Sequence, residues 1–125
     1  MITGSVNAEL EATIRPTVQG PGRQEQDIEA ILDTGVDGSL TLPTSLISPL
    51  GLSWLAREQV LLGDGRIEQL DVYEATVVWD GEPIRVTADA ADIAPVAGMA
   101  LMYGYEPNIR NVEDGAVILK RLTDP

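Results

Sequence analysis

The 125-residue sequence predicts a single mostly-β domain, residues 1–125, with low helix content. It contains two Trp, three Tyr and no Phe, so its core must consist of Val, Ile, Leu, Ala and Met. Such aliphatic and β-branched side chains favour strands. Short apolar runs are separated by the hairpin turn sequences Gly63-Asp64-Gly65, Asp80-Gly81 and Asp114-Gly115. We expect about eight short strands in a closed, barrel-like sheet with one or two short helices.

The first half of the chain predicts strands that lead to one marked acid. Alternating apolar and polar residues over 6–14 indicate a half-buried strand, ended by Pro16 and the segment 19–22. A second strand, with Ile28, Ala30 and Leu32 on one face, leads directly into Asp33. We therefore expect Asp33 where a strand stops.

The remaining elements are short and bounded by Gly and Pro. Residues 39–42 predict a strand, and Pro43 predicts the start of a helix that Pro49 and Gly51 keep to a turn or two. The other expected elements are a hairpin of residues 59–62 and 66–72 whose second arm continues to Trp79, a strand over 83–87, a short helix over 99–103, and a closing strand pair, 109–112 with 116–122.

Composition excludes several functions. A formal net charge of -12 repels nucleic acid and anionic membrane surfaces. The absence of Cys excludes disulfides and thiol nucleophiles, and the N-terminal residues have no signal-peptide pattern, so we expect a cytoplasmic protein. The absence of His excludes Ser-His-Asp catalysis and His-containing zinc sites. Any catalysis must therefore use groups such as carboxylates, hydroxyls or Lys, and the 20 Asp and Glu are the obvious supply.

Asp33, in Asp33-Thr34-Gly35, has three interpretations. The tripeptide could be a simple turn, because all three residue types favour turns. It could open a calcium loop with Asp37 and Gly38, but Gly35 stands at the third ligand position and Thr44 where a bidentate Glu is needed. It could instead be catalytic, because paired aspartates can activate water for peptide hydrolysis.

The order of motifs resembles that of the retropepsin-like aspartic proteases, in particular their small bacterial single-domain members. The matching features are the N-terminal strands, Asp33-Thr34-Gly35 after an apolar strand, a hairpin over residues 60–70, and Val96-Ala97-Gly98 before a closing strand pair. The resemblance implies an aspartic endopeptidase without cofactor or metal that acts on peptides or proteins. Because the chain has one Asp-Thr-Gly, it also implies a homodimer in which each protomer gives one Asp33.

The resemblance assigns roles to further residues. Thr34 would make hydrogen bonds across the dimer axis, Gly35 would let the two backbones approach, and Gly98 would lie under the catalytic loop. The hairpin would be a flap that closes over substrate. The residues expected to bind substrate are Asp37, Gly38, Leu62, Gly63, Asp64 and Gly65.

Two positions depart from the family pattern and bear on dimer affinity. Ala97 is smaller than the expected aliphatic residue, and Met99 replaces an Arg that viral relatives use to hold the dimer. A catalytically inactive, protease-like module for dimerisation or peptide binding is therefore the alternative function. A carboxylate-pair glycosidase is a third, but the chain has no second acid in a comparably marked setting.

Overall fold

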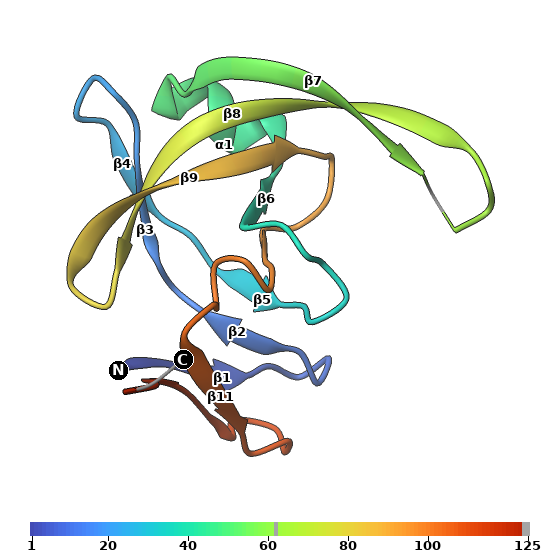
Figure 1. Cartoon of the computed structure of the whole chain (residues 1–125). Helices are drawn as coiled ribbons and strands as arrows, with labels where there is room; N and C mark the ends of the chain where they lie inside the picture. The colour runs from blue at the N-terminus through green and yellow to red at the C-terminus, as the bar shows by residue number, and fades with distance from the viewer. Residues whose placement is uncertain (62, 124–125) are drawn as a thin grey trace.

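The computed structural model describes residues 1–61 and 63–123, and it is mostly β (Figure 1). The described residues form twelve strands and one α-helix. The strands form one sheet in the order β11-β12-β1-β2-β5-β10-β6-β9-β8-β3-β4, with β7 paired to β8 off this path. The mostly-β prediction is confirmed. The path runs from β11 to β4, and the closure of the barrel stays a prediction.

The N-terminal strands form a hairpin where one strand is predicted. Strand β1 (Ile2–Val6) pairs antiparallel with β2 (Ala12–Ile14), so the prediction of a single strand over residues 6–14 is wrong. The Asn7 side-chain oxygen accepts the N–H groups of Glu9 and Glu11 at 3.1 and 2.9 Å. Leu10 has φ 61. Asn favours such local turns over a continuous strand. The alternation of apolar and polar residues continues through the turn, so it does not reveal that the chain reverses there.

Three short strands at the centre bring distant parts of the chain together. Strand β10 (Val96–Ala97) lies between β5 (Ala30–Leu32), which it pairs in parallel, and β6 (Leu40–Leu42), which it pairs antiparallel. Ala97 is opposite both Leu32 and Leu40. The end of β5, the end of β10 and the start of β6 therefore lie side by side, at the same end of these three central strands.

A long hairpin leaves the body of the molecule. Strand β8 (Ile67–Trp79) pairs with β7 (Ser53–Leu61) and β9 (Glu82–Ala90). The last part of β8 also pairs with β3 (Thr17–Gln19), and β3 pairs in turn with β4 (Glu25–Asp27). Figure 1 shows the free end of β7–β8 reaching well beyond the rest of the sheet. Strand β9 in turn pairs in parallel with β6. The predicted long second arm is confirmed.

The predicted first helix is confirmed and the second is wrong. Helix α1 (Thr44–Leu50) contains Pro49 and ends at Gly51, which has φ 64. Residues 99–103 instead form turns, with the N–H of Met102 bonded to the Gly98 oxygen at 3.3 Å. Gly104, with φ 84, then reverses the chain into β11 (Tyr105–Ile109), which pairs with β12 (Ala116–Arg121). The reversal stops the turns from extending into a helix.

The buried core is aliphatic, as predicted, with Trp79 as its one buried aromatic among the described residues. It joins the N- and C-terminal strands to the central strands and the inner part of β8–β9. Its most completely buried large side chains are Ile14, Leu40, Leu42, Leu50, Leu119, Val6, Val18, Val77 and Val117. Burial of this surface fixes the short strands whose ends hold Asp33.

Candidate active site

Asp33 lies in the first position after β5, as predicted. Its N–H donates to the Ala97 oxygen at 3.0 Å, which extends the pairing of β5 with β10 by one residue. One oxygen of its carboxylate accepts the Gly35 N–H at 2.8 Å, and its carbonyl accepts the Val36 N–H at 3.2 Å. The local sequence therefore folds into a tight turn that holds the carboxylate against its own backbone.

Gly98 lies directly against this turn. A Cβ at Gly98 would be 2.2 Å from the Gly38 oxygen and 2.9 Å from the Val36 oxygen. The N–H of Met99 donates to the Val36 oxygen at 2.7 Å, and the N–H of Gly98 donates to the Ser39 oxygen at 2.9 Å. The segment after β10 thus supports the loop between β5 and β6, here called the Asp33 loop (residues 33–39), through backbone contacts. Only Gly fits at position 98 without moving this loop.

The residues of the Asp-Thr-Gly motif point outwards. Asp33, Thr34 and Gly35 are all exposed, although the strands on either side are partly or fully buried. Met99 is 48% exposed, and its N–H bonds to Val36 in the loop that Asp33 begins. The hydrogen-bonded motif and the Met99 side chain thus form an exposed surface with both polar and apolar character.

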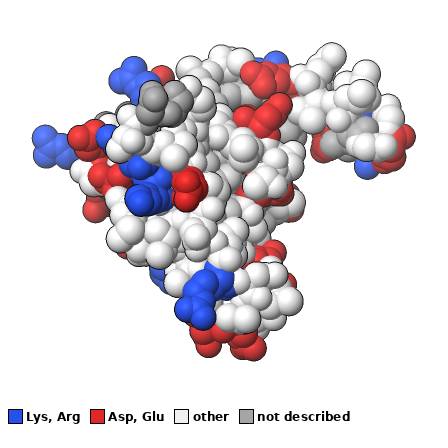
Figure 2. Space-filling view, turned by 60° about the horizontal axis from the view of Figure 1, so that its bottom comes forward, with Lys and Arg blue, Asp and Glu red and all other residues white. Residues whose placement is uncertain are grey.

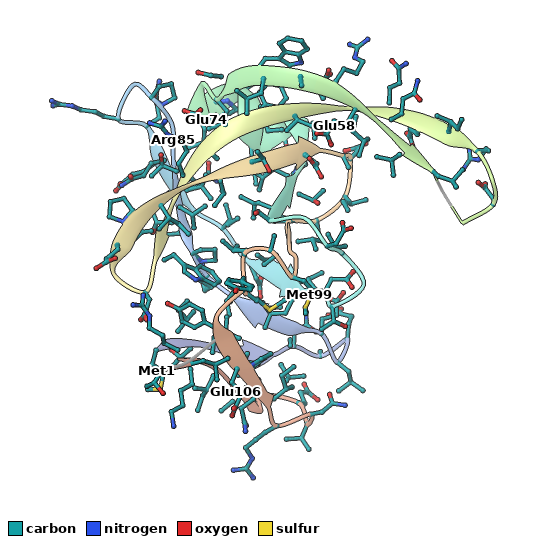
Figure 3. The ribbon with its side chains drawn as sticks, in the orientation of Figure 1. Met1, Glu58, Glu74, Arg85, Met99 and Glu106 are labelled. Carbon is teal, nitrogen blue, oxygen red and sulfur yellow. The ribbon has the colours of Figure 1, made fainter. Side chains whose placement is uncertain are left out.

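Two acids that sequence reasoning did not single out lie near the predicted substrate residues Asp37 and Gly38. A carboxylate oxygen of Asp89, on β9, is 3.7 Å from where a Gly38 Cβ would be. Partial burial raises the pKa of Asp89, and the carboxylates of Glu58 and Asp37 raise it further. Glu58 lies on the hairpin strand β7 (Figure 3). This side of the loop is therefore strongly acidic.

The described residues of the hairpin end lie well away from β5, the strand that leads into Asp33 (Figure 1). Leu62 lies outside the described residues. Gly63, Asp64 and Gly65 are exposed, and neither glycine has an atom within 4 Å of an added Cβ. Asp64 instead accepts the backbone N–H of Arg66 at 3.0 Å and its Nε–H at 2.6 Å, and these two hydrogen bonds lower the pKa of Asp64. Among the described residues of the chain, the predicted flap and the Asp33 loop therefore remain separate.

The base of the hairpin is braced by a side-chain network. One oxygen of Asp71, on β8, accepts the Trp54 indole N–H and the Arg57 Nε–H, each at 3.1 Å. The indole hydrogen bond and then that of Arg57 lower the pKa of Asp71. Because Arg57 is directly opposite Asp71, the three side chains connect the two strands where they leave the body.

Residues 1–61 and 63–123 contain no group of three or more His, Cys, Asp or Glu side chains arranged to hold a metal ion. The calcium interpretation therefore gains no geometric support. The same part of the chain has no helix with the length and apolar character needed to cross a membrane.

Comparisons with known proteins find similarity in structure rather than in sequence. No family model matches the chain, and no curated protein matches it. A retropepsin-like aspartic protease from Rickettsia conorii aligns with a TM-score of 0.58 at 17% identity, covering 94% of this chain and 87% of that one. EIAV protease, complexed with the inhibitor HBY-793, aligns with a TM-score of 0.56 at 22% identity, covering 77% and 88%.

The chain therefore has the fold of the retropepsin-like aspartic proteases. This confirms the predicted resemblance at the level of the fold. Within this fold, the single Asp-Thr-Gly begins directly after the central strand β5.

Proposed function

We propose that the protein is an aspartic endopeptidase whose active site forms between two copies of the chain. The observation that carries the proposal is the exposed Asp33-Thr34-Gly35 turn, which is hydrogen-bonded to Ala97 and lies in a loop packed against Gly98 in a retropepsin-like fold. One chain supplies one such aspartate, and peptide hydrolysis by carboxylates needs two. The homodimer supplies the second.

The chemistry follows from two carboxyl groups that face each other. Like charges about 3 Å apart cannot both ionise, so the pair shares one proton. The ionised Asp33 takes a proton from a bound water, which attacks the peptide carbonyl carbon. The protonated Asp33 of the second copy donates to the carbonyl oxygen, which gives a tetrahedral diol. The first Asp33 then passes the proton taken from water to the amide nitrogen as the C–N bond breaks, and the second Asp33 takes back a hydroxyl proton as the new carboxyl group forms. The Gly35 N–H bond to Asp33 fixes the carboxylate orientation during this exchange.

Thr34 and the hairpin complete the proposed site. The exposed Thr34 hydroxyl would form hydrogen bonds across the two-fold axis and set the separation of the two acids. The β7–β8 hairpin would act as the flap, because its tip has no contacts within 4 Å of its glycines and its base is braced at Asp71. Closure over a bound peptide would exclude water and add backbone hydrogen bonds. Asp37 and Gly38 would border the substrate.

The direct test is the Asp33→Asn substitution. Purified wild-type protein, incubated with a peptide library across acidic to neutral pH, should release cleaved products that mass spectrometry identifies. Asp33→Asn should reduce the rate by at least about a thousandfold, because the substituted dyad cannot ionise to activate water. The matched control is Asp27→Asn, at an exposed acid on β4.

Three results decide the proposal. Equal cleavage by wild type and Asp33→Asn would overturn it. Inhibition of wild type by pepstatin, whose central hydroxyl mimics the transition state, would support it. No cleavage at any pH by a protein that is dimeric would instead indicate the inactive module.

A further inference from the structure

We infer that a groove at the outer edge of the hairpin is a second docking site, for an extended, positively charged polypeptide segment. This edge groove lies between residues 68–71 of β8 and residues 90–93, with Thr44 at one end, and its volume is about 550 Å³. None of its lining residues belongs to the Asp33 loop or to the segment at Gly98. The groove is thus separate from the Asp33 loop, and it shares only strand β8 with the proposed flap.

The groove exposes an unpaired strand edge. On one side β8 pairs with β7 from Ile67 to Glu74, whereas on the other side β9 begins to pair only at Val72. Beyond β9 the chain turns away from β8, because the Ala91 N–H donates to the Leu42 oxygen at 3.1 Å. Residues 67–71 therefore keep one partner strand. An extended peptide can add to such an edge through backbone hydrogen bonds.

The side chains of the edge groove combine apolar and acidic character. Leu70 is half-buried, and Ile93 is 53% exposed. Glu68 and Asp92 are exposed, and the ion pairs found within the described ranges do not include them. Figure 2 shows acidic side chains gathered where the hairpin leaves the body. A strand with alternating apolar and basic residues would match both features.

The charge of the whole chain favours the same occupant. With a net charge of -12, the protein attracts positively charged segments from a distance. The acidic side chains that line the groove can then bind such a segment at a defined position. Asp71, also in the lining, is already paired with Arg57 and leaves Glu68 and Asp92 for the ligand. If the protein is a protease as proposed, a substrate with a basic segment would be held at two places.

The test measures binding without turnover. A short fluorescein-labelled peptide of alternating Lys and Val is titrated with the full chain carrying Asp33→Asn, and fluorescence anisotropy reports binding. The expected result is saturable binding that the combined Glu68→Lys and Asp92→Lys substitutions weaken about tenfold or more. The control is the doubly substituted Glu106→Lys and Glu113→Lys, which makes the same charge change at two exposed acids outside the groove, of which Glu106 lies on β11 (Figure 3).

Strand addition is tested with backbone-methylated peptides. Peptides N-methylated at all Lys or at all Val lose opposite sets of N–H donors, so one should bind much more weakly than the other. The inference is overturned if the control pair weakens binding as much as the groove pair, if a Glu and Val peptide binds equally well, or if both methylated peptides bind like the parent. Because no cleavage is measured, these outcomes are independent of the Asp33 activity test.

Discussion

At the scale of single residues, Gly98 is the position where backbone packing most directly limits substitution. A methyl group at Gly98 would be 2.2 Å from the Gly38 oxygen, which is backbone and cannot rotate away. We expect Gly98→Ala to lower the free energy of unfolding by about 1–3 kcal/mol, as overpacked cores do, and to displace the Asp33 loop. Urea denaturation measures the first effect.

The control for Gly98→Ala is Gly63→Ala. An added Cβ at Gly63 has nothing within 4 Å, so its unfolding free energy should stay within about 0.5 kcal/mol of wild type. Similar losses at both glycines would show that the close approach beneath the loop does not limit stability.

Asp89 predicts a pH-dependent effect on stability. Burial and the nearby Glu58 and Asp37 raise its pKa above the ordinary value of 3.8, so the folded state binds the proton more tightly than the unfolded state. The wild-type protein therefore loses stability as the pH rises through the raised pKa. Asp89→Asn should increase the free energy of unfolding at pH 7, and the gain should disappear as the pH falls towards 3.8.

Denaturation of Asp89→Asn and wild type at a series of pH values checks this dependence. Glu106→Gln removes one exposed carboxylate far from this cluster and should leave stability within about 0.5 kcal/mol of wild type. A gain for Asp89→Asn that is the same at every pH would contradict the assignment, because only titration of Asp89 makes the gain vary.

The residues of the candidate site differ in how far sequence could predict them. The Asp33-Thr34-Gly35 motif is contiguous and follows an apolar strand, so its place at a strand end was predictable. Asp89 and Glu58 come from two other strands, and the parallel pairing of Thr41 with Asp89 brings one of them to the loop. Pairings between strands far apart in sequence leave no local pattern, so these acids could not be foreseen.

At the scale of elements, the brace at the base of the hairpin should control how often its strands open. Trp54→Phe removes the indole N–H that donates to Asp71 but keeps an aromatic ring. We expect faster hydrogen exchange of the β7–β8 amides, with a change in global stability below about 1 kcal/mol because the network is exposed. Hydrogen exchange followed by mass spectrometry measures this locally.

The matched change for the brace is Arg85→Gln. It breaks the exposed pair of Arg85 with Glu74, at 3.4 Å, in the part of β8–β9 that lies against the body (Figure 3). Exchange in the hairpin should be unaffected by it. If Arg85→Gln accelerates hairpin exchange as much as Trp54→Phe does, the network at Asp71 is not the brace.

Elements were predictable where turn chemistry and burial agree. Asp80-Gly81 ends β8 because Asp80 and Gly81 both have positive φ, and Gly51 ends α1 in the same way. Residues 6–14 mislead because their period-2 pattern continues through the Asn7 turn. The helix predicted over 99–103 is absent for a different reason. The first N–H groups of this segment bond to the Asp33 loop, and Gly104 reverses the chain directly after it.

At the scale of the whole molecule, the proposed dimer must overcome its own charge. Each copy carries -12, and the surface that would meet its partner includes the exposed Asp33 and Met99. Two strongly negative chains repel one another, whereas burial of apolar surface such as the Met99 side chain attracts them. Neither Ala97, which is fully buried, nor Met99 brings a positive charge to offset the repulsion.

This balance predicts that salt strengthens the dimer. Dissolved ions screen repulsion between the two chains and leave apolar burial intact, so the dimer dissociation constant should fall as ionic strength rises from about 0.01 to 1 M, where the Debye length shrinks from about 30 to 3 Å. Sedimentation equilibrium at several protein concentrations measures the dissociation constant, and peptide cleavage per chain should rise as this constant falls. Parallel series in sodium and potassium chloride separate screening from specific ion binding. A dimer that salt weakens would show that ion pairs between the chains outweigh their repulsion.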